Sequence, residues 1–281
     1  MDDGSQDDSG KTCDAFSQKY ENVTVVHCPN GGVARARNIG LSAAHGKYIA
    51  WIDSDDYVEH TWLPTVLKLL REKSPDVLMF DYYREDNTNK TICRLPFLNG
   101  NVEPHECIFE LSRDIAMHSY LWQCIIKHEL YKDRYFDTEN IIQEDYDMFT
   151  HLFVKINSIH YYKMPLYHYV QHETSLMHKK VSMERSIVEI RNAKKRCEIF
   201  SDYGFKISKS GYWRSLMGNY LLIACTRGRD NITNQIFSDI KKDFWLMIRS
   251  SDLTIRMKIK LILISYVPFS LYSIFYKSLK S

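Results

Sequence analysis

An acidic turn follows an apolar run near residue 50 and is the clearest place in the sequence for chemistry. Residues 48–52 have the length and composition of a strand buried in a sheet, and Asp53, Asp55 and Asp56 follow directly. Ligands of open α/β sheets bind at the carboxyl ends of the strands. Carboxylates this close together repel one another unless a cation lies between them. Asp53 and Asp55 therefore predict a site for Mg²⁺ or Mn²⁺, which would suit a diphosphate; a strand end before an acidic helix start is an equally good interpretation.

The segments around this turn alternate between helix and strand. Apolar residues recur at helical spacing on both sides of it, and short apolar or β-branched runs separate the helical segments. We expect helices over residues 11–20, 33–45 and 61–73, and strands over residues 23–27, 48–52 and 76–83. Alternation of this kind favours an α/β fold with a mostly parallel, doubly wound sheet.

The pattern is less regular after residue 88 and mainly helical after residue 181. We expect strands over residues 91–96, 159–162 and 166–170, and helices over residues 103–117 and 145–156, while residues 119–126 fit either element. Further helices are expected over residues 182–200, 209–226 and 234–248. The sequence thus predicts two parts, an α/β domain over residues 1–178 and a helical region over residues 179–281.

Composition and charge narrow the class of protein. The 281 residues are 44% hydrophobic, which is enough for a substantial core. A formal net charge of +2 gives no reason to expect nucleic acid as a partner. The seven cysteines are scattered without a CxxC pair, so neither a zinc site nor a disulfide framework is indicated. A cytoplasmic protein in a reducing environment fits best.

The C-terminal tail combines basic and apolar residues. Residues 261–276 are mostly apolar, but serine and proline residues interrupt them, and a membrane-spanning helix needs about 20 predominantly apolar residues. The basic residues that flank this run are Arg256, Lys258, Lys260, Lys277 and Lys280. The pattern predicts peripheral contact with an anionic inner membrane leaflet. Helices that fold back on the preceding domain are an equally weighted alternative.

A series of short motifs occurs in a fixed order along the first 178 residues. The motifs are Asp2-Asp3-Gly4-Ser5, the block from Asn30-Gly31-Gly32 to Ala36-Arg37-Asn38-x-Gly40, the DxD turn Asp53-Ser54-Asp55-Asp56, Trp122 with Lys127, the pair Glu144-Asp145, and Pro165-Leu166-Tyr167 with Tyr169. Together they resemble the family 2 glycosyltransferases with the GT-A fold, in particular bacterial enzymes that build capsule, lipopolysaccharide or exopolysaccharide repeats. The resemblance implies transfer of a sugar from a nucleotide-sugar, with a UDP-sugar expected, to a glycan or polyisoprenyl-linked acceptor.

The resemblance also implies roles for individual residues. Asp145 would be the catalytic base, which removes a proton from an acceptor hydroxyl so that the oxygen attacks the anomeric carbon with inversion. Asp55 would coordinate the Mn²⁺ or Mg²⁺ that bridges the diphosphate, with Asp53 near the metal and the ribose. The other implied roles are nucleotide-sugar binding by Asp3, which would recognise the uracil or ribose, and by Arg37 and Asn38, and acceptor binding by Trp122 and Glu144. His168 or His172 could supply a third metal ligand, although a histidine taken from the 11 in the chain is usually not a ligand.

The residues themselves leave simpler interpretations open. Asp145 opens an amphipathic helix, where the helix dipole favours a negative charge. Trp122 lies in an apolar run and fits a core position, and Arg37 could pack or pair with a local aspartate. The family normally carries a strand and a helix before the Asp-Asp-Gly-Ser turn, so we expect a start site placed too late or a truncated gene.

Two other functions also remain open. One is a catalytically inactive, truncated glycosyltransferase-like protein that binds a ligand or partner, which the missing first strand favours. The other is a nucleotidyltransferase, which shares an α/β sheet and an acidic metal site. The Glu144-Asp145 pair speaks against this second alternative.

Overall fold

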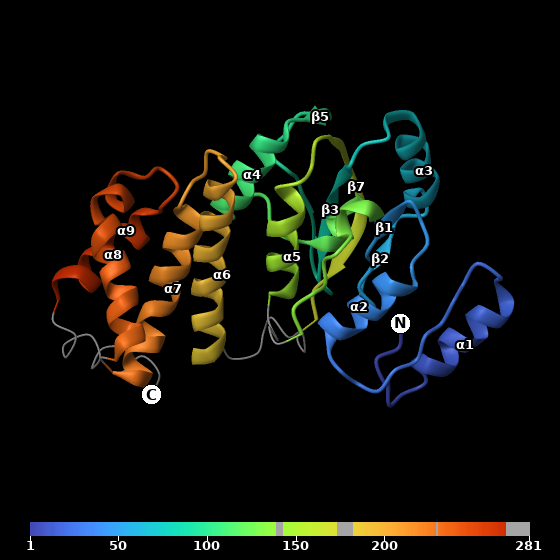
Figure 1. The fold of residues 1–281 in the computed structure, drawn as a ribbon, viewed down its shortest axis with the longest axis horizontal. Helices are drawn as coiled ribbons and strands as arrows, with labels where there is room; N and C mark the ends of the chain where they lie inside the picture. Colours follow the sequence, from blue (N-terminus) through green and yellow to red (C-terminus); the bar gives the residue numbers. More distant parts are fainter. Residues whose placement is uncertain (139–142, 173–181, 229, 268–281) are drawn as a thin grey trace.

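The computed structural model describes residues 1–138, 143–172, 182–228 and 230–267. A curved sheet with helices on both faces lies beside a group of C-terminal helices (Figure 1). The helices are α1 (Ser9–Lys19), α2 (Val33–Ala43), α3 (Trp62–Lys73), α4 (Pro104–Arg113), α5 (Glu144–Phe153), α6 (Met183–Asp202), α7 (Ser210–Arg227), α8 (Asn231–Arg249) and α9 (Ile255–Tyr266). The strands are β1 (Tyr48–Ala50), β2 (Tyr57–Val58), β3 (Val77–Glu85), β4 (Lys90–Cys93), β5 (Gly100–Val102), β6 (Cys124–Lys127) and β7 (Ile159–Val170).

The α/β class is confirmed, but the sheet is not mostly parallel. Its order is β1-β6-β3-β7-β2, with β4 paired to β3 and β5 paired to β7. Within the described residues, only the β3–β7 ladder is parallel, and every other ladder is antiparallel. The reason is that β6 lies between β1 and β3 and runs opposite to both. Strands β1, β3 and β7 still share one direction, which brings their carboxyl ends to the same edge.

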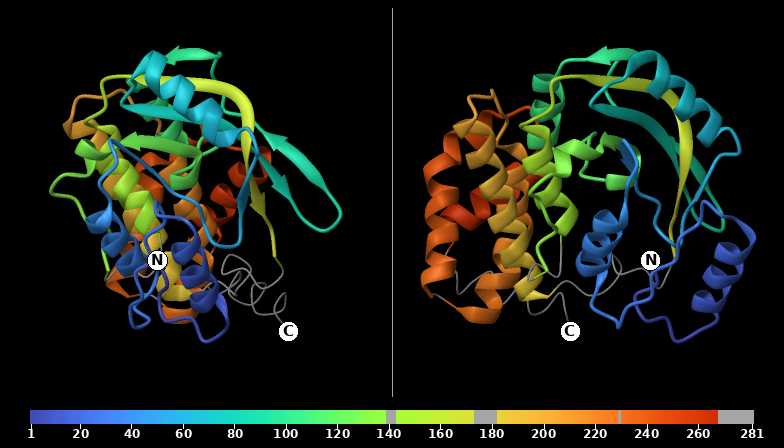
Figure 2. Two further views of the ribbon diagram at one scale, coloured as in Figure 1. Left: turned by 90° about the vertical axis from the view of Figure 1, so that its right-hand side faces the viewer. Right: turned by 45° about the vertical axis from the view of Figure 1, so that its right-hand side comes forward.

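The central strand β3 divides the core between the two faces of the sheet. Its residues alternate, so that Val77 and Met79 pack with α4 and α5, while Leu78 and Phe80 pack with α3. All four of these side chains are fully buried. The long strand β7 pairs in parallel with β3 along its length and curves with the sheet (Figure 2). The burial of β3 on both faces accounts for its continuous apolar sequence.

Several expected elements differ from those observed. Residues 23–27 form no strand; they contribute an isolated bridge between Asp2 and His27. Residues 119–126 divide into a 3₁₀ turn (Leu121–Gln123) and β6. The two strands expected over residues 159–162 and 166–170 are one strand, β7, with register shifts where Asp81 pairs with Pro165. A proline that cannot donate a ladder hydrogen bond marks this irregularity.

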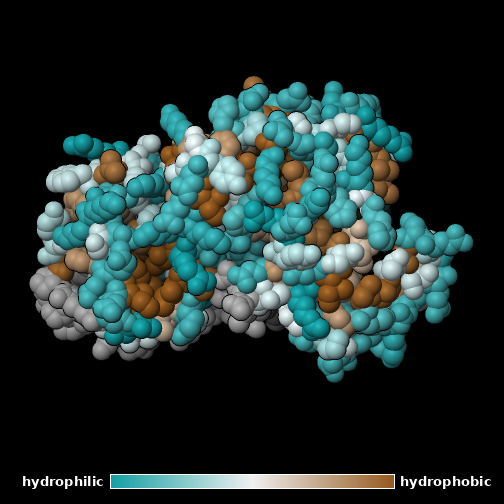
Figure 3. All heavy atoms as spheres, in the orientation of Figure 1, coloured by the Kyte–Doolittle hydropathy of each residue, from teal (hydrophilic) through white to brown (hydrophobic). Residues whose placement is uncertain are grey.

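The C-terminal helices α6–α9 form a second core. Helices α6, α7 and α8 lie side by side (Figure 1). At the starts of α6, α8 and α9, a side chain accepts a hydrogen bond from a backbone N–H group that has no partner within the helix. The capping pairs are Ser182 with the N–H of Arg185, Asp230 with that of Thr233, and Thr254 with that of Met257. Helix α6 also reaches the first core through its buried Phe200. The front surface is largely hydrophilic, with separate hydrophobic areas over these helices and beside α2 (Figure 3).

No helix in the described ranges has both the length and the apolar character needed to cross a membrane. The first residues of the apolar tail expected over residues 261–276 belong to helix α9, which ends at Tyr266. Residues 268–276 of this tail lie outside the described residues.

Candidate active site

Arg37 on α2 connects two of the predicted motifs. Its Nη2 lies 3.3 Å from Oδ1 of Asp53, and its Nη1 donates to Oε1 of Glu144 at 2.5 Å. The guanidinium also lies over the rings of Trp51 and Phe136, at 5.9 and 5.7 Å from their centroids. The arginine is thus held between aromatic rings and two carboxylates. This arrangement brings the turn after β1 and the start of α5 to one place.

Asp145 lies next to this ion-pair network in the first turn of α5. Its Oδ1 accepts the backbone N–H of Tyr146 at 2.7 Å, and the residue keeps part of its surface open to solvent. Burial of the carboxyl group, together with the neighbouring Glu144 carboxylate, raises the pKa of Asp145 to about 7, against the opposing charges of Arg37 and Arg196. A carboxylate that titrates near neutral pH is suited to take up a proton during catalysis.

In the acidic turn after β1, one carboxylate is bound to β7 and two others are open to solvent. Asp56 accepts the hydroxyl of Tyr167 and the backbone N–H of Val170, each at 2.8 Å, which ties the turn to β7. The Tyr167 oxygen also accepts the backbone N–H of Asp53 at 3.1 Å. Burial raises the pKa of Asp56 to about 6. Asp55 is exposed and the Asp53 side chain is 36% exposed, so these two carboxylates face the solvent side of the turn.

The chemistry of this turn fits a hard divalent cation. Asp53 and Asp55 offer oxygen donors two residues apart, and Mg²⁺ in phosphate-binding sites commonly takes one or two carboxylates, with substrate oxygens and water completing its shell. In the described part of the chain, no group of three or more histidine, cysteine or acidic residues is placed to hold a metal by itself.

His168, one of two candidates for a third metal ligand, has both ring nitrogens occupied. Nε2 lies 3.0 Å from Glu59 and Nδ1 lies 3.2 Å from Glu85. The ring is stacked against Tyr57 and Tyr83 and is 3% exposed. Both ring nitrogens are thus engaged by carboxylates in this arrangement, which favours a structural role for His168, and metal binding by this residue stays a prediction. The other candidate, His172, is exposed just beyond β7, and its role stays a prediction.

Asp3 and Asn38 both hold loops around the site. The two oxygens of Asp3 accept the backbone N–H groups of Gly31 and Gly32 at 2.9 and 2.8 Å. Gly32 has a φ of 85°, which glycine adopts readily, and α2 with Arg37 starts at the next residue. Asn38 exchanges two hydrogen bonds with the backbone of Phe136, at 2.8 and 2.7 Å. These contacts give both residues a supporting role, and direct contact with a nucleotide stays a prediction.

Trp122 occupies a core position. The residue is 5% exposed, and its ring is stacked with Tyr120 and Tyr167 at centroid distances of 4.8 and 4.5 Å. Its segment enters the middle of the sheet through β6, which places the indole among the aromatic side chains between the sheet and α3. This burial leaves little of the ring exposed, and the role of Trp122 in acceptor binding stays a prediction.

Part of the chain is similar in sequence to known proteins. Residues 1–125 match the family described as Glycosyl transferase family 2. Glycosyltransferase GlyG of Streptococcus pneumoniae serotype 4 is 43% identical over 90 residues, which are 32% of this chain and 30% of GlyG. The minor teichoic acid biosynthesis protein GgaB of Bacillus subtilis is 26% identical over 226 residues, 72% of this chain and 24% of GgaB. The chain thus spans less than a third of the length of these two relatives.

The fold comparison covers nearly the entire chain. The crystal structure of residues 1–349 of S. aureus TarS in complex with UDP-GlcNAc matches with a TM-score of 0.60 at 18% identity, over 99% of this chain and 81% of TarS 1–349. That structure has the GT-A fold. Residues 1–125 are thus similar in sequence to glycosyl transferase family 2, and the chain as described has a GT-A fold like that of TarS.

Proposed function

We propose that the chain transfers a sugar from a nucleotide-sugar to a hydroxyl group of a glycan or lipid-linked acceptor, with inversion at the anomeric carbon. The observation that carries this proposal is the Asp145 carboxyl group, whose pKa is about 7, beside the Glu144–Arg37–Asp53 network. Asp145 accepts the proton of the acceptor hydroxyl while the hydroxyl oxygen bonds to the anomeric carbon and the nucleoside diphosphate leaves. General-base assistance of this kind contributes about 10²–10⁴-fold to the rate.

The donor is proposed to bind at the turn after β1. Asp53 and Asp55 would hold Mn²⁺ or Mg²⁺, which offsets negative charge on the departing nucleoside diphosphate when it is bound. Arg37 holds the Asp53 side chain in an ion pair at 3.3 Å. The TarS structures that match this fold contain UDP-GlcNAc or UDP, which supports a UDP-sugar as the donor class. The relation to GgaB supports a cell-surface polymer as the product class.

A membrane surface is the proposed location of the acceptor. Helix α9 carries a stripe of apolar side chains, each at least 46% exposed. The stripe consists of Ile255, Ile259, Ile262, Leu263 and Tyr266, with the basic residues Arg256, Lys258 and Lys260 on the same helix. Apolar and basic residues combined in this way suit the anionic inner leaflet, where a polyisoprenyl-linked acceptor would be held.

A binding protein without activity is the main competing function, since the comparisons favour glycosyltransferases over nucleotidyltransferases. An active glycosyltransferase and an inactive binding protein are distinguished by measuring Mn²⁺-dependent binding of UDP-sugars by calorimetry together with release of UDP. We expect both binding and release in the presence of bacterial lipid-linked glycan acceptors. Tight binding with no release of UDP from any donor, with or without these acceptors, would instead indicate the inactive protein.

A further inference from the structure

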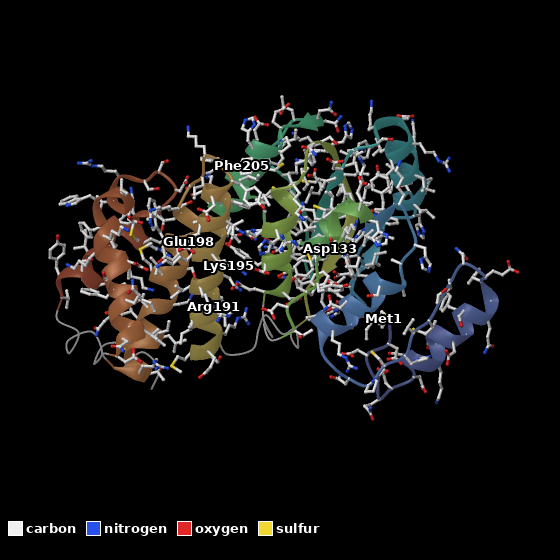
Figure 4. All side chains as sticks on the ribbon, viewed as in Figure 1. Met1, Asp133, Arg191, Lys195, Glu198 and Phe205 are labelled. Carbon is white, nitrogen blue, oxygen red and sulfur yellow. The ribbon has the colours of Figure 1, made fainter. Side chains whose placement is uncertain are left out.

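Helix α6 of the C-terminal group contacts the beginning of α5, where Asp145 lies. Figure 4 labels Lys195 on the part of α6 that faces α5. Three side chains of α6 make hydrogen bonds to this region. Asn192 donates to Oε1 of Gln143 at 3.4 Å, and Lys195 donates to Oδ1 of Asp147 at 2.8 Å. Arg196 donates to the backbone oxygen of Tyr146 at 2.8 Å. The turn that carries the proposed base is thus fixed from a helix that lies outside the residues of the family match.

The start of α5 needs such support. Gln143, the residue before the helix, has a φ of 64° and lies in the left-handed region. A residue other than glycine in this region costs about 1–3 kcal/mol when the surrounding structure holds it there. No side chain caps the helix at this position. The hydrogen bond from Asn192 to Gln143 is therefore one of the contacts that keep Glu144 and Asp145 in place.

Arg196 is the most buried of these contacts, at 1% exposure. Its Nε donates to the Thr150 hydroxyl at 2.8 Å, and its Nη2 donates to the Ser119 hydroxyl at 2.5 Å. Its Nη1 donates to the backbone oxygen of Leu111 at 3.3 Å, and the guanidinium carbon lies 3.1 Å from the centroid of the Tyr146 ring. All of its hydrogen-bond partners in the described part of the chain are neutral oxygens, so a costly buried charge lies beneath α5 without direct neutralisation.

The charge of Arg196 also acts on Asp145, the residue next to Tyr146, whose backbone oxygen Arg196 binds. Burial and the Glu144 carboxylate raise the pKa of Asp145, whereas the positive charges of Arg37 and Arg196 both lower it. In the described part of the chain, the ionisable groups that interact with Asp145 include Glu144, Arg37, Arg196 and Tyr120. Asp114 interacts with Arg196. Asp114 has its own partner, His118, at 2.8 Å. Within the described residues, the Asp145 carboxylate accepts the N–H of Tyr146 but makes no ion pair, so the charge of Arg196 matters more to it.

We propose that Arg196 is a positioning residue for Asp145, which fixes the first turn of α5 and supplies a buried positive charge that favours the ionised carboxylate. This inference rests on the proposed function, because it takes Asp145 as the base. It also gives the C-terminal helices a part in catalysis, since α6 carries the residue that supports the base.

The test compares Arg196→Met, Arg196→Lys and the control Lys194→Met. Lys194 is the neighbouring cation on α6, but it pairs with Asp239 of α8 at 2.9 Å and not with α5. In Arg196→Met, the acidic limb of the kcat/KM–pH profile is expected to move up by about one pH unit, because a nearby positive charge is lost. Arg196→Lys should keep the limb near its original pH but lower kcat about 10- to 100-fold through misplacement of α5. Lys194→Met should change neither.

A second measurement works without turnover. The titration of Asp145 is followed through its ¹³C-labelled carboxyl carbon by NMR and assigned by its loss in Asp145→Asn. If wild-type protein releases no UDP, the proposed function fails, while an upward move of the Asp145 titration in Arg196→Met still supports the role of Arg196. An unmoved titration overturns it. If Arg196→Met does not fold, the neutral variant Arg196→Gln replaces it in the titration. An unmoved Asp145 titration in Arg196→Gln, or a wild-type kcat in Arg196→Lys, refutes the proposal.

Discussion

Replacing Asp145 by asparagine removes an ionisable carboxylate and keeps a side chain of nearly the same size. Wild-type kcat/KM should rise to a plateau through about pH 7, because only the ionised carboxylate accepts a proton and its pKa is about 7. Asp145→Asn should lower the plateau about 10²–10⁴-fold. Binding of UDP measured by calorimetry should stay nearly unchanged, because the carboxylate contacts the backbone N–H of Tyr146 and not the acidic turn at Asp53.

The same substitution has a second, opposite effect on stability. The pKa of Asp145 rises from an ordinary value of 3.8 to about 7 on folding, so the folded protein binds the proton more tightly than the unfolded chain. Stability is therefore lost as the pH rises from about 4 to 7. The full difference corresponds to about 4 kcal/mol, and solvent at the open edge of the carboxylate reduces our expectation to about 1–2 kcal/mol. Asp145→Asn should accordingly unfold at a higher temperature than wild type at pH 8, and the gain should vanish near pH 3.

The matched control is Glu184→Gln, which removes an exposed carboxylate from the first turn of α6. It should leave kcat/KM and its pH profile unchanged. The assay is continuous detection of UDP release with Mn²⁺ between pH 5 and 9, with thermal unfolding followed by circular dichroism. An Asp145→Asn variant that keeps its activity, or that loses donor binding and stability together, would show that the carboxylate has a structural role instead of a catalytic one.

Other predictions concern the acidic turn, the tail and the core. Asp55→Ala should abolish Mn²⁺-dependent binding of UDP in calorimetry; unchanged metal dependence would contradict the assignment of the turn. A variant with both Ile259→Asp and Ile262→Asp should lose co-sedimentation with phosphatidylglycerol vesicles, whereas retained binding would exclude this face of α9. Trp122→Ala should lower stability by about 3–5 kcal/mol in denaturant unfolding, as expected for a buried indole; a change in acceptor KM without destabilisation would support its predicted role.

The sequence predicts the helices and most strands because their signals are local. The spacing of apolar residues places α6, α7 and α8 close to their observed bounds, since each buries one face along several turns. The pairing of β6 between β1 and β3 could not be predicted in this way. A strand of four residues carries no information about its partner, and its direction depends on the chain that leads into it.

The same difference between local and long-range signals applies to the candidate site. The Asp53 turn and the Glu144-Asp145 pair are visible as clusters of charge, and the structure brings both to Arg37. The pairing of His168 with two glutamates and the anchoring of Asp56 by Tyr167 are not visible, because these partners lie far apart in sequence. A polar residue in a strand looks the same in sequence whether its partner is a ligand or another side chain.

Arg37 also explains why the two halves of the site form one unit. It joins Glu144, 107 residues away along the chain, to the turn at Asp53. The Arg37 and Glu144 side chains are only 13% and 10% exposed, and desolvation of such a pair offsets much of its attraction, so stability alone is a weak reason for it. Its clearer consequence is geometric. Loss of Arg37 or Glu144 would leave a buried charge and would be expected to separate the acidic turn at Asp53 from the helix that carries Asp145. The proposed donor site and the proposed base would then no longer be aligned.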